Sequence, residues 1–171
     1  MTTMPRPVQL PPFQRLVDEH AAAVAAYLRG LLGATDAEDA VQETYLAALR
    51  AYPGFDGAHP RAWLMTIARR KAIDVARSRA RGPEALAEPD ELPAGDGADP
   101  LAGIGRSRLW ARVAELPPKQ REALLLRYGA DLRYREIGLA MECSEAAARR
   151  SVHEGLTKLR TSERVREEIE A

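Results

Sequence analysis

The stretch RAWLMTIARRKAIDVARSRAR, Arg61 to Arg81, decides the fold because it has the period of a helix and two unlike faces. At about 100° per residue, one side collects Leu64, Ile67, Ala68 and Val75. The opposite side collects Arg69, Arg70, Arg77 and Arg81. Seven basic residues stand here against one acidic residue, Asp74. This density of cations suits a polyanion, although a solvated surface helix explains the stretch about equally well.

Composition points to helices throughout the 171 residues, since Ala, Leu, Arg and Glu dominate and aromatic residues are only 5%. The formal net charge is zero, but it is unevenly distributed. Residues 10–81 carry 10 basic and 8 acidic side chains, residues 82–105 carry 0 and 6, and residues 106–160 carry 12 and 7. Two mildly basic units therefore flank an acidic connector, in a chain long enough for one domain or two small ones.

Cysteine and histidine usage predicts neither a metal nor a cofactor. Cys143 is the only cysteine, which excludes an intramolecular disulfide and a Cys-based zinc site and fits a reducing compartment. The three histidines lack metal-ligand spacing. We also find no signal peptide and no run of 18 apolar residues. We therefore expect a soluble, cytoplasmic protein.

The first unit begins after a leader, 1–12, that we expect to be disordered. The apolar period predicts a helix from Phe13 to Leu32, ending at Gly33. Thr35 and Glu38 then read as a capping box for a second helix that extends to about Ala51. Its predicted inward positions are Ala40, Val41, Tyr45 and Leu49.

The first turns of that second helix are unusually rich in acidic and polar residues: Asp36, Glu38, Asp39, Gln42 and Glu43. Favourable interaction with the helix dipole accounts for about half of them. The remainder suggests a surface that docks on a basic partner.

A loop with strong turn signals, Tyr52 to Pro60, joins this helix to the basic one. It is expected to expose Tyr52, Phe55 and His59 beside the arginines. Planar rings next to cations form the stacking platform used for unpaired bases. Aromatic rings that fold back onto the core are an equally good interpretation.

The second unit follows a connector, 82–105, whose Pro, Gly and acidic residues predict a flexible linker or simply solubility. A first stripe holds Leu109, Val113 and Leu116, and Pro117-Pro118 restart the helix toward Tyr128. A short helix from Arg133 to Met141, a three-residue turn at 142–144 and a last helix capped by Ser144 complete it.

The last helix has two faces. Its inner face is Ala148, Val152, Leu156 and Leu159. Its outer face is Ala146, Ala147, Arg149, Arg150, His153 and Glu154. This is the helix-turn-helix plan, in which small residues allow close approach in a major groove and arginines reach phosphates or guanine edges. An ordinary helical bundle with surface arginines is the alternative.

Two segments together resemble one family. The run from Ala37 to Tyr45, followed by RAWLMTIAR at 61–69 and Ile73-Asp74, looks like region 2 of a bacterial sigma factor. LPPKQR at 116–121, Leu126-Arg127-Tyr128, Glu136-Ile137 and Lys158-Leu159-Arg160 look like region 4. With only these regions, the chain resembles the extracytoplasmic-function (ECF) group. The resemblance implies an all-α fold of two small domains, 13–81 and 106–161, joined by the acidic linker, with a tail at 162–171.

The resemblance also implies roles for the candidate residues. Core RNA polymerase would be held through its β′ clamp by Asp36, Glu38, Asp39, Gln42 and Glu43, and through its β flap. The promoter −10 element would be opened and a base captured by Tyr52, Phe55, His59, Arg61, Trp63, Arg69, Arg70 and Arg77. The −35 duplex would be read by Ser144, Ala146, Ala147, Arg149, Arg150 and His153. An anti-sigma factor is a further partner of this class, and the free protein would be a monomer with no membrane partner, catalytic residue or cofactor.

This chain departs from the family pattern at several positions. Arg70 replaces an Asn, Glu142 stands at a turn position usually occupied by Gly, and Ser151 and Glu154 stand where basic residues are frequent. A non-Gly residue at positive φ costs about 1 kcal/mol, so we expect strain at Glu142. The competing functions are a stand-alone DNA-binding regulator, which would not need the acidic helix, and a polymerase- or anti-sigma-binding adaptor without promoter reading.

Overall fold

The computed structural model describes residues 10–80 and 107–170, and every regular element in these ranges is helical. The first range holds α1 (Phe13–Leu32), α2 (Ala34–Ala51), a 3₁₀ turn η1 (Tyr52–Gly54) and α3 (Pro60–Ala80). The second holds α4 (Ser107–Ala114), α5 (Pro118–Leu124), a π-helical turn η2 (Leu125–Gly129), α6 (Tyr134–Ala140) and α7 (Glu145–Glu170). The predicted all-α fold is confirmed. Arg81, the linker 82–105 and most of the leader lie outside the described residues.

The first unit is a three-helix bundle in which α1 packs on both α2 and α3. The apolar period of α1 buries Val24, Tyr27, Leu28 and Leu31 completely, as an amphipathic helix requires. From α3 the bundle receives mainly Leu64, Met65, Ala68 and Ala72.

The predicted capping box at Thr35 is wrong. Helix α2 begins at Ala34, two residues before the predicted start, with Gly33 as N-cap and no side-chain hydrogen bond at the cap. Gly33 has φ 82°, its N–H donates to Arg29 O at 2.9 Å, and its carbonyl accepts from Ala37 N at 3.2 Å. One glycine in the left-handed region thus ends α1 and starts α2, which a residue with a side chain does less readily.

The second unit packs α5 and α6 against the N-terminal half of α7. Ala148 and Val152 of α7 are buried and Leu156 and Leu159 are half-buried, so the predicted inner face is confirmed. The predicted stripe of α4 is wrong in part. Leu109 is 50% exposed, and Trp110 occupies the buried position beside it.

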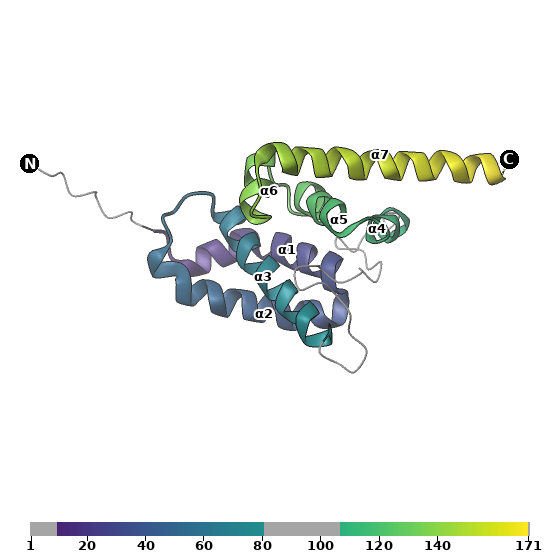
Figure 1. Ribbon diagram of the computed structural model, residues 1–171. Helices are drawn as coiled ribbons and strands as arrows, with labels where there is room; N and C mark the ends of the chain where they lie inside the picture. The colour runs from purple at the N-terminus through teal and green to yellow at the C-terminus, as the bar shows by residue number, and fades with distance from the viewer. Residues whose placement is uncertain (1–9, 81–106, 171) are drawn as a thin grey trace, which may run out of the picture.

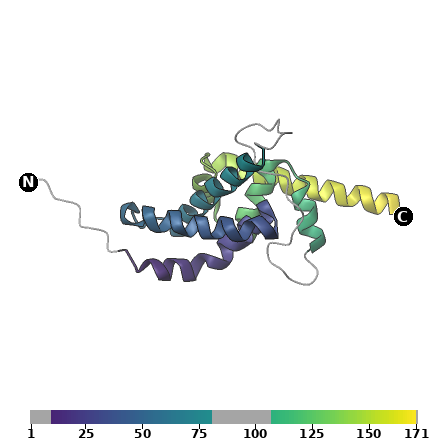
Figure 2. The same ribbon diagram turned by 90° about the horizontal axis from the view of Figure 1, so that it is seen from below.

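The two units lie directly against each other (Figure 1). α3 contacts α6, and α1 contacts η2 and α4. The C-terminal half of α7 extends past the rest of the molecule in both views, so the predicted tail is helical as far as Glu170 (Figures 1 and 2). Among the described residues, no helix is both long enough and apolar enough to cross a membrane.

Candidate nucleic-acid interface

The turn between α6 and α7 is tight. Gly138 of α6 lies so close to it that a Cβ there would be 2.9 Å from Cys143 O and 3.2 Å from Glu145 N. Cys143 N donates to Gly138 O at 2.9 Å. Glu142 has φ 55°, which confirms the positive φ expected at this position. The close approach fixes the angle at which α7 leaves the turn.

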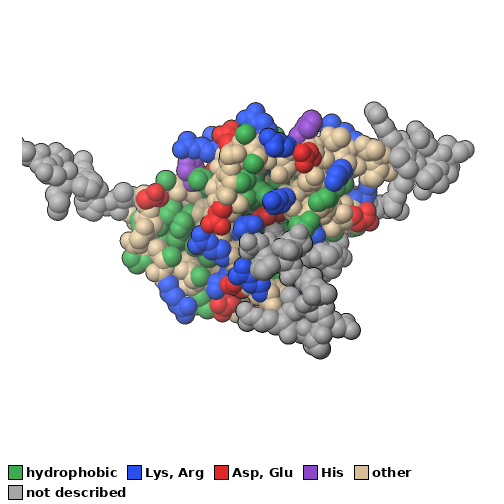
Figure 3. All heavy atoms as spheres, in the orientation of Figure 1, with side chains coloured by type: hydrophobic (Ala, Val, Ile, Leu, Met, Phe, Trp, Pro, Cys, Tyr) green, Lys and Arg blue, Asp and Glu red, His purple; other side chains and the backbone are tan. Residues whose placement is uncertain are grey.

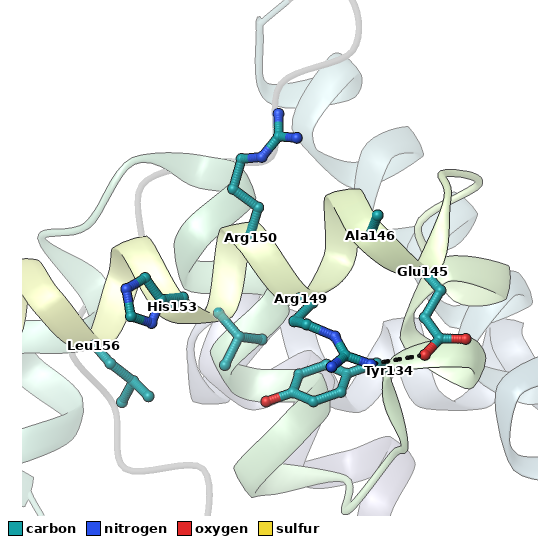
Figure 4. A pocket seen from close by; sticks show the side chains of 8 residues that line it. Tyr134, Glu145, Ala146, Arg149, Arg150, His153 and Leu156 are labelled. Atoms are coloured by element: carbon teal, nitrogen blue, oxygen red, sulfur yellow. Dashed lines mark hydrogen bonds and ion pairs between the residues drawn. The ribbon is translucent and has the colours of Figure 1, made fainter.

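The start of α7 presents the predicted outer face. Ser144 Oγ accepts from Ala147 N at 3.1 Å, which confirms Ser144 as the N-cap. Ala146, Arg149, Arg150 and His153 are exposed, and Ala147 is half-buried. A shallow hollow of about 760 Å³ runs along this face and includes Tyr134 of α6 (Figure 4). The residues predicted to read duplex DNA are therefore brought together on one open helix face.

Basic and acidic side chains are interspersed among apolar ones on the molecular face that carries α3 and α7 (Figure 3). Glu154, which would repel a phosphate, accepts from Gln120 Nε2 of α5 at 3.1 Å. Arg70 donates to Glu142 Oε1 at 2.8 Å. The surface charge is therefore mixed, and the Arg70–Glu142 ion pair neutralises part of it.

Arg69 is not part of an open cationic face. Its side chain is 17% exposed and donates from Nε to Glu122 Oε1 of α5 at 2.7 Å. The same carboxylate oxygen accepts from Tyr27 Oη of α1 at 2.9 Å. The predicted −10 residue Arg69 is thus engaged by the second unit, because the two units meet along this side of α3.

Glu122 was not predicted from the sequence, yet it is the most deeply buried acid of the described residues. Burial raises its pKa, while Arg69, the Tyr27 hydroxyl and Arg121 act in the opposite direction. Burial also raises the pKa of Tyr27 well above its ordinary value, and Glu122 adds to that shift. For Arg69, burial is the largest single effect and lowers the pKa, but the charges of Glu122, Tyr27 and Glu142 and the hydrogen bond to Glu122 together raise it. The pair is therefore held inside the interface at an electrostatic cost to the carboxylate.

Two further contacts join the units at the start of α3. Arg61 Nη1 donates to Ala130 O at 3.2 Å, and its Nε donates to His20 Nδ1 at 3.5 Å. His59 Nδ1 lies 3.7 Å from Glu136 Oε1 of α6. Burial and then Arg61 lower the pKa of His20, which favours its neutral, accepting form. Both predicted −10 residues, Arg61 and His59, therefore lie at the boundary between the units.

The expectation that the loop exposes its rings is wrong for Phe55. Its ring is 9% exposed and stacks on Trp63 with centroids 4.4 Å apart. Tyr52 is half-buried, meets Phe13 edge-on at 5.1 Å and donates its hydroxyl to Pro11 O. Tyr52 and Phe55 therefore fold back onto the core, which was the alternative interpretation. Packing the rings against one another removes their apolar area from water.

A polar cleft of about 710 Å³ lies between α3 and the second unit. Its basic lining residues are Arg69, Arg70, Arg77 and Lys119, and its acidic ones are Asp74 and Glu142. The predicted −10 residues Arg70 and Arg77 are exposed at this cleft.

The outer face of α2 carries the predicted acidic residues. Asp36 pairs with Arg79, and Glu43 lies 3.7 Å from Lys71, whereas Glu38, Asp39 and Gln42 are exposed. Leu46 and Leu49, one and two turns further along, are 47% and 52% exposed. The expectation that Leu49 is buried is therefore wrong. The spacing 39, 42, 46, 49 places a polar and then an apolar stripe on one face.

The chain matches two family models. Residues 16–82 match Sigma-70 region 2, and residues 106–159 match Sigma-70, region 4. The ECF RNA polymerase sigma factor ShbA of Streptomyces griseus is 35% identical over 72% of this chain and 69% of its own length. The RNA polymerase sigma factor CarQ of Myxococcus xanthus is 33% identical over 86% and 87%.

Solved structures show the same fold. The sigma factor RpoE of Bartonella quintana, crystallised with the anti-sigma factor NepR, superposes with a TM-score of 0.70 at 23% identity, covering 89% of this chain and 96% of its own. CnrH, solved with the cytosolic domain of CnrY, gives a TM-score of 0.63 at 24% identity, over 90% and 88%. Both regions, in this order and joined in one chain, place the protein in the ECF group of the sigma-70 family, as a sigma factor that binds core RNA polymerase and directs promoter-specific transcription initiation.

Proposed function

We propose that the second unit reads the −35 element as duplex through the outer face at the start of α7. The observation that carries this proposal is the exposure of Arg149, Arg150 and His153 directly after the small Ala146 and Ala147. In a helix-turn-helix, the N-terminal residues of the second helix contact base edges in the major groove. Ser144, which already caps the helix, would lie at the backbone of the DNA.

The first unit is assigned to the −10 element. Arg70 and Arg77 are the exposed cations of α3 that support this role, with His59 and Arg61 at its start. Trp63, half-buried, is supported from behind by Phe55, and Tyr52 packs beside it. Arg69 joins this surface once its pairing with Glu122 is broken.

Core polymerase is assigned to the outer face of α2. Glu38, Asp39 and Gln42 supply its polar half, together with Asp36 and Glu43, and Leu46 and Leu49 supply an apolar half. A partner with basic and apolar groups in register fits this stripe, as the β′ clamp would. A stand-alone DNA-binding regulator would not need such a surface.

The β flap is assigned to an apolar groove of about 470 Å³ on the second unit, between α4, η2 and α7. Leu109 and Tyr128 are its exposed rim residues, each about half exposed. The groove is lined by later positions of α7, Leu156 to Arg160, than those assigned to DNA. One helix can therefore hold duplex and polymerase at the same time.

The protein would catalyse no reaction itself, since the polymerase forms the phosphodiester bonds. It would act in the cytoplasm, where polymerase and promoter DNA are found. RpoE and CnrH were solved with NepR and the cytosolic domain of CnrY bound. We propose a partner of the same anti-sigma class for this chain.

The −35 assignment is tested by Arg150→Ala in the full chain assembled with core polymerase. If Arg150 contacts a guanine edge, its removal should lower promoter affinity by about 1–3 kcal/mol and relax the preference at that base pair. Lys158→Ala, exposed on the same helix two turns later, is the matched control and should have a smaller effect. Unchanged affinity and base preference in Arg150→Ala would remove this residue from the interface.

A further inference from the structure

The aromatic ring of Tyr134 lies under two guanidinium groups. Tyr134 is the first residue of α6 and is half-buried. Arg149 Cζ of α7 lies 4.8 Å from the ring centroid, and Arg127 Cζ of η2 lies 5.5 Å from it. Both distances are within the range of an attractive cation–π contact. Three elements of the helix-turn-helix unit therefore converge on one ring.

Arg149 is also held from its own helix. Its Nη2 donates to Glu145 Oε1 at 3.0 Å, four residues earlier on α7. In Figure 4 the Arg149 side chain lies across the Tyr134 ring toward Glu145, while Arg150 points away from both. The Arg149 side chain is nevertheless 63% exposed. It is restrained without being buried, so its remaining N–H groups stay accessible to a ligand.

The other cation on the ring is anchored as well. Arg127 Nη1 donates to Leu132 O at 3.0 Å, in the segment leading into α6. This bond accounts for the position of Arg127 without any ligand. The ring thus has a fixed neighbour of its own, while Arg149 reaches the outer face of α7.

We infer that Tyr134 is a positioning residue that orients the Arg149 guanidinium for selection of one base pair of the −35 element. An arginine side chain has many rotamers, and fixing it costs conformational entropy when it binds. A ring on one side and a carboxylate at its end restrict those rotamers before DNA arrives. Preorganisation of this kind improves discrimination, because the fork of N–H donors already has the direction that a base edge requires.

This inference rests on the proposed role of α7 in reading the −35 element. Two measurements distinguish a failure of the inference about Tyr134 from a failure of the proposed −35 role of α7. The first needs no promoter. The order parameter of the Arg149 Nε–Hε group, measured by ¹⁵N relaxation in the free full chain, should fall in Tyr134→Leu and stay at the wild-type value in Tyr134→Phe, which keeps the π face.

The second measurement is base preference. Holoenzyme is assembled with each variant, and initiation is compared on promoters with every −35 base pair substituted in turn. Arg149→Ala identifies the base pair that Arg149 selects. Tyr134→Leu should weaken the preference there about two- to fivefold, the size of an exposed cation–π contact. Tyr134→Phe should keep it, and adding Tyr134→Leu to Arg149→Ala should weaken it no further.

Each outcome has a defined meaning. An unchanged order parameter in Tyr134→Leu overturns the inference, as does an equal loss of activity on all promoters, which would indicate a merely structural role. If Arg149→Ala changes no base preference, the assignment of Arg149 to the −35 element fails and the inference fails with it. If Tyr134→Leu melts well below the wild type, Tyr134→Met takes its place in both experiments.

Discussion

At the scale of single residues, Glu122 has the largest energetic consequence. Glu122 as a residue is 1% exposed, and its carboxylate accepts from Tyr27 and Arg69, which belong to the other unit. Removing one member of a buried ion pair leaves the other charge poorly compensated. The free energy of unfolding therefore depends on this side chain more than on any surface pair.

Glu122→Ala should lower the free energy of unfolding by about 3 kcal/mol, because Arg69 and the Tyr27 hydroxyl lose their common acceptor. Urea unfolding of the full chain measures this. Glu142→Ala is the control, since its pair with Arg70 is more than half exposed on both sides and should contribute at most about 1 kcal/mol. Equal, small losses in both variants would mean that the buried contact adds little.

No pattern in the sequence marks Glu122 as buried. It lies beside Arg121, also buried, in a segment whose charged residues read as a solvent face. The apolar period of a helix shows which residues share a face. It does not show whether another unit of the molecule will cover the polar face of that helix. The same limit explains Arg69, whose face was predicted correctly but whose partner lies 53 residues away.

At the scale of elements, the helix-turn-helix depends on the close approach of α6 to the turn. A Cβ at Gly138 would meet backbone atoms of Cys143 and Ser144, which cannot rotate away. Gly138→Ala should therefore destabilise the protein by about 1–3 kcal/mol, despite the better helix propensity of alanine. Thermal unfolding measures the change. Gly129→Ala is the control, because a Cβ added there would meet no neighbouring atom within 4 Å. A similar fall in melting temperature in both variants would show that the close approach at Gly138 is not the cause.

The α2 face gives a prediction about polymerase. Asp39→Arg and Leu46→Glu should each weaken binding to core polymerase at least about tenfold. The first puts a positive charge opposite a basic partner, and the second puts a charge in the apolar half of the proposed interface. Fluorescence anisotropy of labelled full chain titrated with core measures this. Asp18→Arg makes the same charge change on exposed α1 and should bind normally. Binding that resists both α2 changes would remove this face from the interface.

Local signals predicted elements better than their partners. The period of α7 and its Ser144 cap follow from neighbours along the chain, and both predictions are confirmed. The prediction of a capping box at Thr35 was wrong because Gly33, which adopts a positive φ at low energetic cost, is the N-cap of α2. Leu49 and Leu109 were predicted to be buried because they fit an apolar stripe. Both are about half exposed, because the neighbouring helices cover only part of each stripe.

At the scale of the whole molecule, the contact between the units conflicts with simultaneous reading of two promoter elements. Elements centred near −10 and −35 are separated by about 25 base pairs, or about 85 Å at about 3.4 Å per pair. Helix α7, with 26 residues, is only about 39 Å long at about 1.5 Å per residue. With the −10 element assigned to the first unit and the −35 element to the second, as proposed above, the units must separate and the pairing of Arg69 with Glu122 must break when both elements are bound.

Fluorescence energy transfer should report this separation. Labels at Ala22→Cys and Thr157→Cys, both exposed, in a Cys143→Ser background, should move apart when core polymerase and promoter are added. Transfer that stays unchanged during initiation would show that the units remain packed.

The same labels test the effect of pH. Burial raises the pKa of Glu122 in the packed state above its value in the separated state. The pH-dependent part of its contribution to packing is then fully present below the ordinary glutamate pKa and is lost as the pH rises through the raised value. Transfer should therefore increase as the pH falls below neutral, and Glu122→Gln should reduce that step. An undiminished step in Glu122→Gln would assign it to another group.

The claim that this protein directs promoter-specific initiation is tested most directly by mapping transcription start sites. Purified core polymerase transcribes genomic fragments with and without the protein, and the start sites are compared. Discrete new starts that share sequences near −10 and −35 should appear only with the protein. Arg150→Ala should weaken these starts, and Asp39→Arg should abolish them. Binding to core or to DNA without any new start would show that the protein does not direct initiation.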